Sequence, residues 1–234
     1  MTNEAARAAA STTARIVWAT ADKYLRNVVE PQEYGDYILP FTVLRRLECL
    51  LEDMKEDVIE FVEARSGIPP ILIDIAVAEG FGLSFYNVSP LNLAHIASVD
   101  DNVDKAVLSY VNGFSHNIAD IWTAFEFPKL VEKLSAANRL LAVVKHFSTL
   151  SLGSTSIEDS MMGDIFEDVM YRAFDKKGKA AGAFYKPRDA IKLMVDVLFA
   201  ADAESLVGED VLRSIYKAFS PTWIQNGGTV ALAA

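Results

Sequence analysis

The sequence has a single cysteine and no long apolar run, and each shortage excludes a class of protein. Cys49, alone among 234 residues, has no second cysteine for an internal disulfide, which suits a reducing compartment. Its neighbours are mostly leucines, so we expect a buried thiol rather than a nucleophile. No run of about 18 apolar residues occurs, and the richest stretch, 71–78, is interrupted by Asp74, so no membrane span is expected.

Histidine is also scarce, which argues against a metal centre. The three histidines, His95, His116 and His146, are 21 and 30 residues apart, and none has a second ligand at helical spacing. A zinc site needs clustered Cys, His or carboxylate ligands. No G-x-S-x-G signature supports serine nucleophile chemistry either. We therefore predict no metal ligands and no catalytic residues in this chain.

Positive charge is the third shortage. The net charge is −10, and the only local basic cluster is Lys176, Lys177 and Lys179. DNA-binding proteins gain affinity by neutralising phosphates with Lys and Arg, so this chain is unsuited to holding DNA by itself. Hydrophobic residues make up 51%, which suggests apolar surface covered by a partner protein. The alanine-rich start contains Glu4 and no apolar core, so it is not a targeting peptide, and a cytoplasmic location is expected.

The sequence pattern that is present is helical. Residues 5–28 predict one helix with Ile16 on its apolar side, and spacings of three to four from Tyr34 to Phe61 predict a long second helix containing Pro40. Further helices are expected over 91–97, 102–113, 116–125, 128–135, 138–147, 157–174 and 209–219. Residues 71–79 fit either a short helix or a buried strand, and 80–82 a loop. The predicted fold class is mainly α.

One loop stands out because two aromatic residues precede an apolar helix. In the stretch GAFYKPR at 182–188, Lys186 precedes a proline and should be extended. Pro187 fits the first position of the following helix, where its missing N–H costs nothing. A helix N-terminus offers backbone N–H groups to an anionic or polar ligand. Taken by itself, the stretch fits an ordinary packed loop-to-helix joint better than a binding loop.

Five sequence blocks carry a resemblance to a known family. They are IVWATADK at 16–23, YGDYILPFTVLRRL at 34–47, MGDIFEDV at 162–169, GAFYKPR at 182–188 and KLMV at 192–195. Together they resemble the modification (methyltransferase) subunit of type I restriction–modification systems, over about residues 12–218. The first two blocks resemble the helical N-terminal domain of that family, and the others resemble the start of its methyltransferase domain.

The resemblance implies an activity, a cofactor and partners. The family methylates the exocyclic N6 amine of adenine in DNA with S-adenosylmethionine, and the adenine must leave the duplex to be reached. Two modification subunits work with one DNA-specificity subunit, and a restriction subunit can join. The resemblance also assigns one wall of the S-adenosylmethionine pocket to six residues, Ala183, Phe184, Tyr185, Lys186, Pro187 and Arg188.

The chain departs from the family pattern in two places. The family usually has threonine at the position of Lys186, and lysine cannot cap a helix, a loss of about 0.5–2 kcal/mol. The Gly-rich cofactor turn and the Asn-Pro-Pro-aromatic motif are missing: after Ser220 the chain reads PTWIQNGGTVALAA. We therefore expect no methylation, and weak or absent S-adenosylmethionine binding, by this chain alone.

These observations predict two regions. Residues 1–155 are expected to form a helical domain that contacts the specificity subunit, the second modification subunit and, in part, bound DNA. The restriction subunit of the type I complex is a further expected partner, and DNA is reached through the complex. Residues 156–234 are expected to begin an α/β adenine-N6 methyltransferase domain that is not completed, as in a cloned fragment or truncated gene. The alternative is a stand-alone helical interaction module or regulator without enzymatic activity.

Overall fold

The computed structural model describes residues 3–99, 101–157 and 159–176. These residues belong to one compact unit, 1–178; a second unit, 179–234, lies outside the described part. The described residues are mostly helical, and their only β pairing is an isolated antiparallel bridge between Asn87 and Phe114. The predicted mainly α class is confirmed. None of the described helices combines the length and apolarity that a membrane crossing requires.

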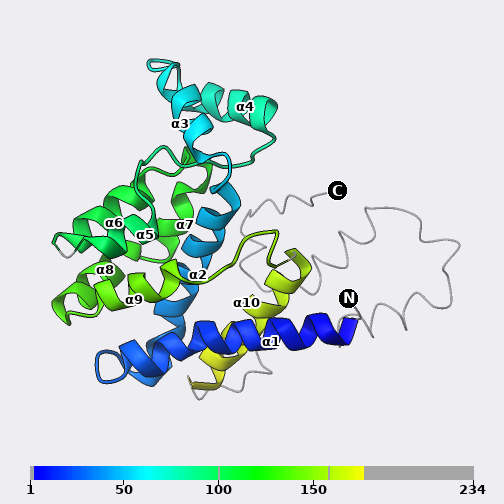
Figure 1. The fold of residues 1–234 in the computed structure, drawn as a ribbon. Coiled ribbons are helices and arrows are strands. Elements are labelled where there is room, and N and C mark those ends of the chain that lie inside the picture. Colours follow the sequence, from blue (N-terminus) through cyan, green and yellow to red (C-terminus); the bar gives the residue numbers. More distant parts are fainter. Residues whose placement is uncertain (1–2, 100, 158, 177–234) are drawn as a thin grey trace, which may run out of the picture. The chain divides into compact units, whose positions relative to one another are not determined.

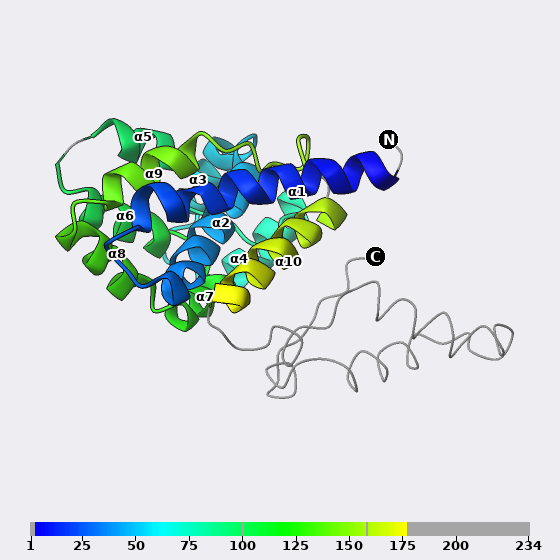
Figure 2. The same ribbon diagram turned by 90° about the horizontal axis from the view of Figure 1, so that it is seen from below.

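Three long helices meet at one end of the unit. The first is α1 (Asn3–Thr20), continued by a π-helical turn (Ala21–Leu25); the others are α2 (Tyr34–Leu51) and α10 (Asp159–Lys176). Helices α1 and α10 lie side by side, and both contact α2 (Figures 1 and 2). Their contact faces bury Val17, Ile165 and Val169 completely. The predicted apolar side of α1 is wrong at Ile16, which is 47% exposed.

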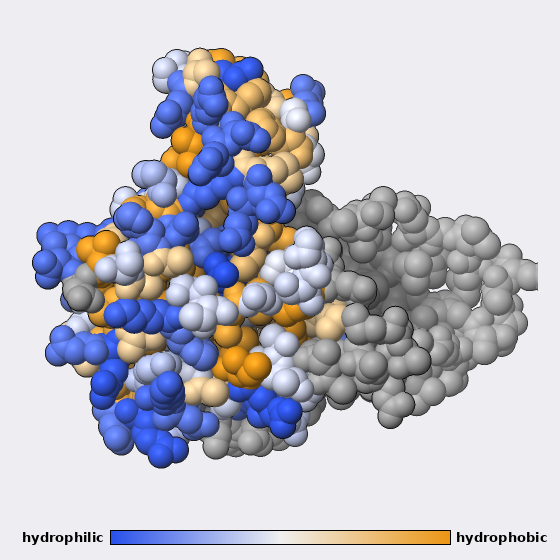
Figure 3. Space-filling model, in the orientation of Figure 1, coloured by the Kyte–Doolittle hydropathy of each residue, from blue (hydrophilic) through white to orange (hydrophobic). Residues whose placement is uncertain are grey.

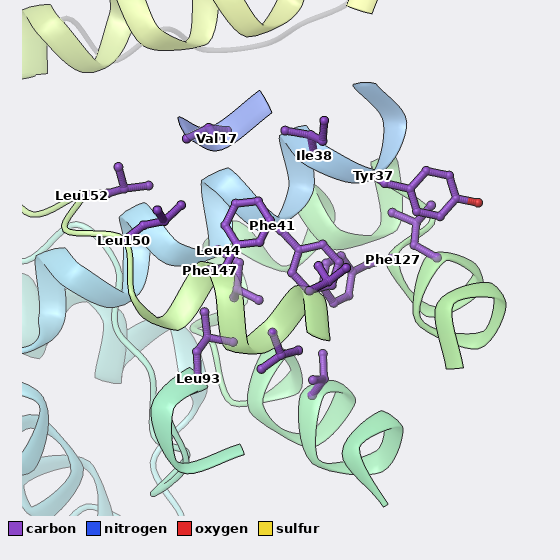
Figure 4. Packing of buried hydrophobic residues seen from close by; sticks show 14 of the residues in the cluster. Val17, Tyr37, Ile38, Phe41, Leu44, Leu93, Phe127, Phe147, Leu150 and Leu152 are labelled. Atoms are coloured by element: carbon purple, nitrogen blue, oxygen red, sulfur yellow. The ribbon is translucent and has the colours of Figure 1, made fainter. Parts of the chain in front are cut away.

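The helices between residues 93 and 148 pack together on the other side of α2. They are α5 (Leu93–Ser98), α6 (Val103–Asn112), a 3-10 turn (His116–Ile118), α7 (Ala119–Ala124), α8 (Phe127–Ala136) and α9 (Leu140–Ser148). Aromatic rings join α8 and α9 to α2, since the ring centroid of Phe41 lies 5.3 Å from that of Phe127 and 5.5 Å from that of Phe147 (Figure 4). The predicted helices between 91 and 147 are confirmed, with ends shifted by a few residues.

A helical hairpin projects from this body (Figure 1). It consists of α3 (Lys55–Glu63) and α4 (Pro70–Phe81), which resolves the ambiguity over 71–79 in favour of a helix. The predicted long helix from Tyr34 to Phe61 is wrong, because α2 ends at Leu51 and a turn precedes α3. The predicted loop at 80–82 begins later than expected: α4 continues to Phe81 and ends at Gly82, whose φ of 68° is left-handed.

Candidate functional site

The predicted cofactor wall, 183–188, lies outside the described residues. The structure does describe the segment that leads toward it. Residues 149–157 follow α9 and precede α10 in the sequence, and Leu150, Leu152 and Ile157 along this connection are buried. A connecting segment with buried backbone must find hydrogen-bond partners for its carbonyl groups. Its partners come from α2.

Two consecutive arginines of α2 hold the connection. Arg45 donates from Nε to the carbonyl oxygen of Leu150 at 2.7 Å. Arg46, whose side chain is almost fully buried, donates from Nη1 to the carbonyl oxygens of Leu152 and Ile157, the latter at 3.1 Å. Figure 4 shows Leu150 and Leu152 next to α2. We call Arg45 and Arg46, with the three carbonyl groups that they bind, the arginine clamp.

A buried carboxylate balances the clamp. Glu48 forms an ion pair with Arg45 and accepts a hydrogen bond from the backbone N–H of Leu93 at 2.7 Å, where α5 begins. It also accepts a hydrogen bond from the hydroxyl of Tyr110. The pKa of Tyr110 is raised, mainly by burial and next by the negative charge of Glu48. A buried charge needs such pairing, since an unpaired one is costly. Glu48 therefore ties α5 and α6 to the same part of α2.

The thiol of Cys49 adjoins the clamp. Its Sγ lies 3.9 Å from the carbonyl oxygen of Leu150, and burial is the main cause that raises the pKa of the thiol. The thiol is therefore kept protonated, which is unsuited to nucleophilic chemistry. The side chain is only partly buried, so the prediction of a buried thiol holds in part. Cys49 acts here as a packing residue beside the connection.

Beyond the connection, α10 packs back onto the helical core. A Cβ atom built on Gly35 of α2 would lie 2.3 Å from Cβ of Ala173 in α10, far inside contact distance. Gly35 thus permits a close approach of the two helices. Helix α10 therefore shares a core with α1 and α2, although it follows the connection in sequence.

The three histidines considered as metal ligands lie far apart in the sequence and occupy different elements of the structure. His146 lies beside the ring of Tyr24, with ring centroids 5.8 Å apart, and burial lowers its pKa. His95 and His116 occupy α5 and the 3-10 turn. Within the described ranges, no three His, Cys, Asp or Glu side chains gather in a way that holds a metal ion.

The sequence reasoning missed the clamp, although a signal was present. Arg45, Arg46 and Glu48 lie in the part of α2 whose apolar spacing is most regular, between Leu44 and Leu51. Long charged residues are almost never buried unless they are paired. Consecutive arginines followed by a carboxylate three residues after the first, on a helix predicted to be buried, are thus a signature of an internal ion pair.

Comparison with known families relates these features to function. Residues 13–147, more than half of the chain, match the family described as HsdM N-terminal domain. Residues 157–212 match the family described as N-6 DNA Methylase. The two matches are separated by residues 148–156. The arginine clamp binds Leu150 and Leu152 within this interval and Ile157, the first residue of the second match.

One curated relative is named a methylase subunit. The type I restriction enzyme MjaIX methylase subunit of Methanocaldococcus jannaschii is 25% identical over 203 residues, covering 78% of this chain and 34% of the relative. The chain thus spans about a third of the length of that subunit. No solved structure matches the chain. The chain belongs to the family of HsdM N-terminal domains, and its helical domain is followed by part of an N-6 DNA methylase region.

Proposed function

We propose that this chain is the N-terminal part of a type I modification subunit that methylates adenine N6 in DNA, and that its helical domain serves assembly. One observation carries the proposal most: a helical domain and a methylase region follow one another in the expected order, joined by a buried connection. Helix α10 lies within the methylase match yet packs on α1 and α2. A partner that binds the helical domain would thereby also orient the start of the methylase region.

The proposed division into two functional regions falls at 155/156. The family matches support it, because the first ends at residue 147 and the second begins at 157. We propose that 1–155 contacts other subunits and that 156–234 begins the methyltransferase domain. A stand-alone interaction module is disfavoured, since such a protein has no use for a methylase region.

The proposed cofactor is S-adenosylmethionine. The N-6 DNA methylase family implies a methyl donor, and its match includes the predicted wall formed by Ala183, Phe184, Tyr185, Lys186, Pro187 and Arg188. Phe184 and Tyr185 would offer aromatic surface to the cofactor, while Lys186 would offer a point charge to its carboxylate. The Gly-rich turn of the family is missing from this sequence, so the chain alone should bind the cofactor weakly or not at all.

The proposed partners are the specificity subunit, a second modification subunit and the restriction subunit of a type I complex. The relative is named a methylase subunit, which supports a multi-subunit assembly. With a net charge of −10, this chain would reach DNA through the complex rather than by holding phosphates itself.

The test is co-purification of the full 234-residue chain with the specificity subunit of its own system. The chain carries the affinity tag, and an unrelated helical protein with the same tag is the control. We expect a stable complex that survives size-exclusion chromatography. The assembly role would be contradicted if the specificity subunit were recovered with neither tagged protein, or if the control recovered as much of it as the chain does.

A further inference from the structure

The α3–α4 hairpin presents an apolar strip to solvent. Ile71, Leu72 and Ile75 of α4 are 66%, 52% and 50% exposed, and Ile68 just before the helix is also exposed. Residues three and four apart lie together on one side of a helix, so Leu72 and Ile71 both adjoin Ile75. Single exposed apolar residues are ordinary, but neighbouring ones mark an interaction surface. We call these four side chains the hairpin strip.

The hairpin strip lies on the outer side of α4, away from the surface by which α4 packs against α3. The inner face of the hairpin is occupied by a separate small core, formed by Val58, Ile73, Val77 and Tyr86. The rings of Phe61 and Phe81 also meet edge to face, 5.1 Å apart, and fix the two helices to each other. Helix α4 is thus apolar on its inner and outer sides. A helix of this kind is normally buried on both, so the outer side calls for a partner.

The hairpin, together with the turn that precedes it, is strongly acidic. Residues 52–81 hold eight carboxylates and two cations, a net charge of −6 out of −10 for the whole protein. Glu56, Glu60 and Glu63 are exposed on α3 at helical spacing, so they form one acidic ridge. Figure 3 shows apolar and strongly hydrophilic residues next to each other on this projection.

The two cations of the hairpin are engaged in contacts within the chain. Lys55 donates to the carbonyl oxygen of Leu91 and lies over the ring of Tyr110, with Nζ 5.0 Å from its centroid. The guanidinium of Arg65 stacks on the ring of Phe61 and donates to its carbonyl oxygen at 2.9 Å. A partner therefore meets an acidic, apolar surface.

We propose that the hairpin strip docks the specificity subunit of the complex, which would meet it with an apolar helix face edged by Lys and Arg. Charge decides between the possible occupants. DNA and anionic membranes would be repelled by the acidic ridge, and two copies of this hairpin would repel each other. Only a basic-edged protein surface satisfies both the apolar strip and the carboxylates. This proposal rests on the proposed function, because it requires the domain to work within an assembly.

The experiment measures the affinity of the full chain for the specificity subunit, with wild type and three variants. The double substitution Ile71→Gln/Ile75→Gln should weaken binding about tenfold or more, since residues at the centre of an interface carry most of its energy. Glutamine favours helix, so the fold should be unaffected. The matched control is Ile16→Gln, which removes an isoleucine of similar exposure from α1 and should leave affinity unchanged.

A third variant tests the charge. The triple substitution Glu56→Gln/Glu60→Gln/Glu63→Gln should weaken binding at low salt. It should also make the affinity depend less on salt, because the variant has less electrostatic attraction to the basic partner for salt to screen. This variant leaves the strip intact, so it tests the docking surface even if the double variant is poorly folded.

The outcomes separate the two proposals. Absence of binding by the wild-type chain contradicts the assembly role, and with it this inference. Wild-type binding that is unchanged in both hairpin variants overturns the hairpin inference alone. A wild-type dimer that the double variant abolishes would also overturn it, in favour of a second copy of this chain.

Discussion

Arg46 of α2 donates from Nη1 to the carbonyl oxygen of Ile157 at 3.1 Å, 111 residues later in the chain. The first residue lies inside the HsdM N-terminal domain match, and the second is where the N-6 DNA methylase match begins. One buried guanidinium thus joins the two regions. An arginine suits this position because its planar fork offers several donors in fixed directions.

Removal of this guanidinium should destabilise the unit. Arg46→Met leaves the carbonyl groups of Leu152 and Ile157 without their donor, and each buried unsatisfied group costs about 1–3 kcal/mol. We expect the free energy of unfolding, measured with urea and circular dichroism, to fall by about 2–4 kcal/mol. Arg46→Lys should fall between, because lysine keeps the charge without the fork.

The control for this substitution is Arg139→Met, at an exposed arginine before α9. It should change the free energy of unfolding by no more than about 0.5 kcal/mol. If Arg46→Met is as mild as Arg139→Met, the connection is not held by the arginine clamp.

Gly35 gives a test in which the sign of the effect is informative. Replacement of a helical glycine by alanine ordinarily stabilises by about 1 kcal/mol. Here the new Cβ would collide with Cβ of Ala173, so we expect Gly35→Ala to destabilise by about 1–3 kcal/mol. The double variant Gly35→Ala/Ala173→Gly should recover part of the loss. A gain in stability from Gly35→Ala would mean that α10 does not pack on α2.

His146 should make the protein less stable in mild acid. Burial lowers its pKa in the folded state below the ordinary 6.5, and the nearby charge of Lys23 acts in the same direction. The unfolded chain therefore binds this proton more readily, so the contribution is complete above 6.5 and is lost as the pH falls toward the folded pKa. His146→Gln should reduce the drop in urea midpoint between about pH 7.5 and pH 5.5. An unchanged drop would contradict this assignment.

S-adenosylmethionine titrated into the purified chain should bind weakly or not at all. The sequence holds one predicted wall of the pocket, including Phe184 and Tyr185, but no Gly-rich turn to cradle the cofactor. Calorimetry is the measurement, and low-micromolar affinity would overturn this expectation. Lys186→Thr is the informative variant: if Lys186 holds the cofactor carboxylate, any residual binding should weaken further.

Local spacing predicted most helices because their apolar residues follow the helical period. The break between α2 and α3 escaped detection, since apolar residues continue across it: Leu51 ends one helix and Met54 precedes the next. The loop expected at Gly80 was wrong because one glycine inside a helix is tolerated when tertiary packing supports the helix, and Phe81 contacts Phe61.

The candidate site was less predictable than the helices. The clamp depends on contacts between α2 and residues more than 100 positions later, which no local pattern encodes. Likewise, nothing near Gly35 in sequence indicates Ala173. The resemblance supplied the family and its cofactor wall, while the structure supplied the join between the two regions.

The central claim is that the first helix of the methylase region belongs to the core of the helical domain. Hydrogen exchange at the backbone amides of α10 tests it most directly, in wild type and in Arg46→Met. We expect the amides around Ile165 and Val169 to be protected nearly as well as those around Phe41, and Arg46→Met to lower the protection of α10 before that of α2. Rapid exchange throughout α10 in the wild-type chain, with α2 still protected, would contradict it.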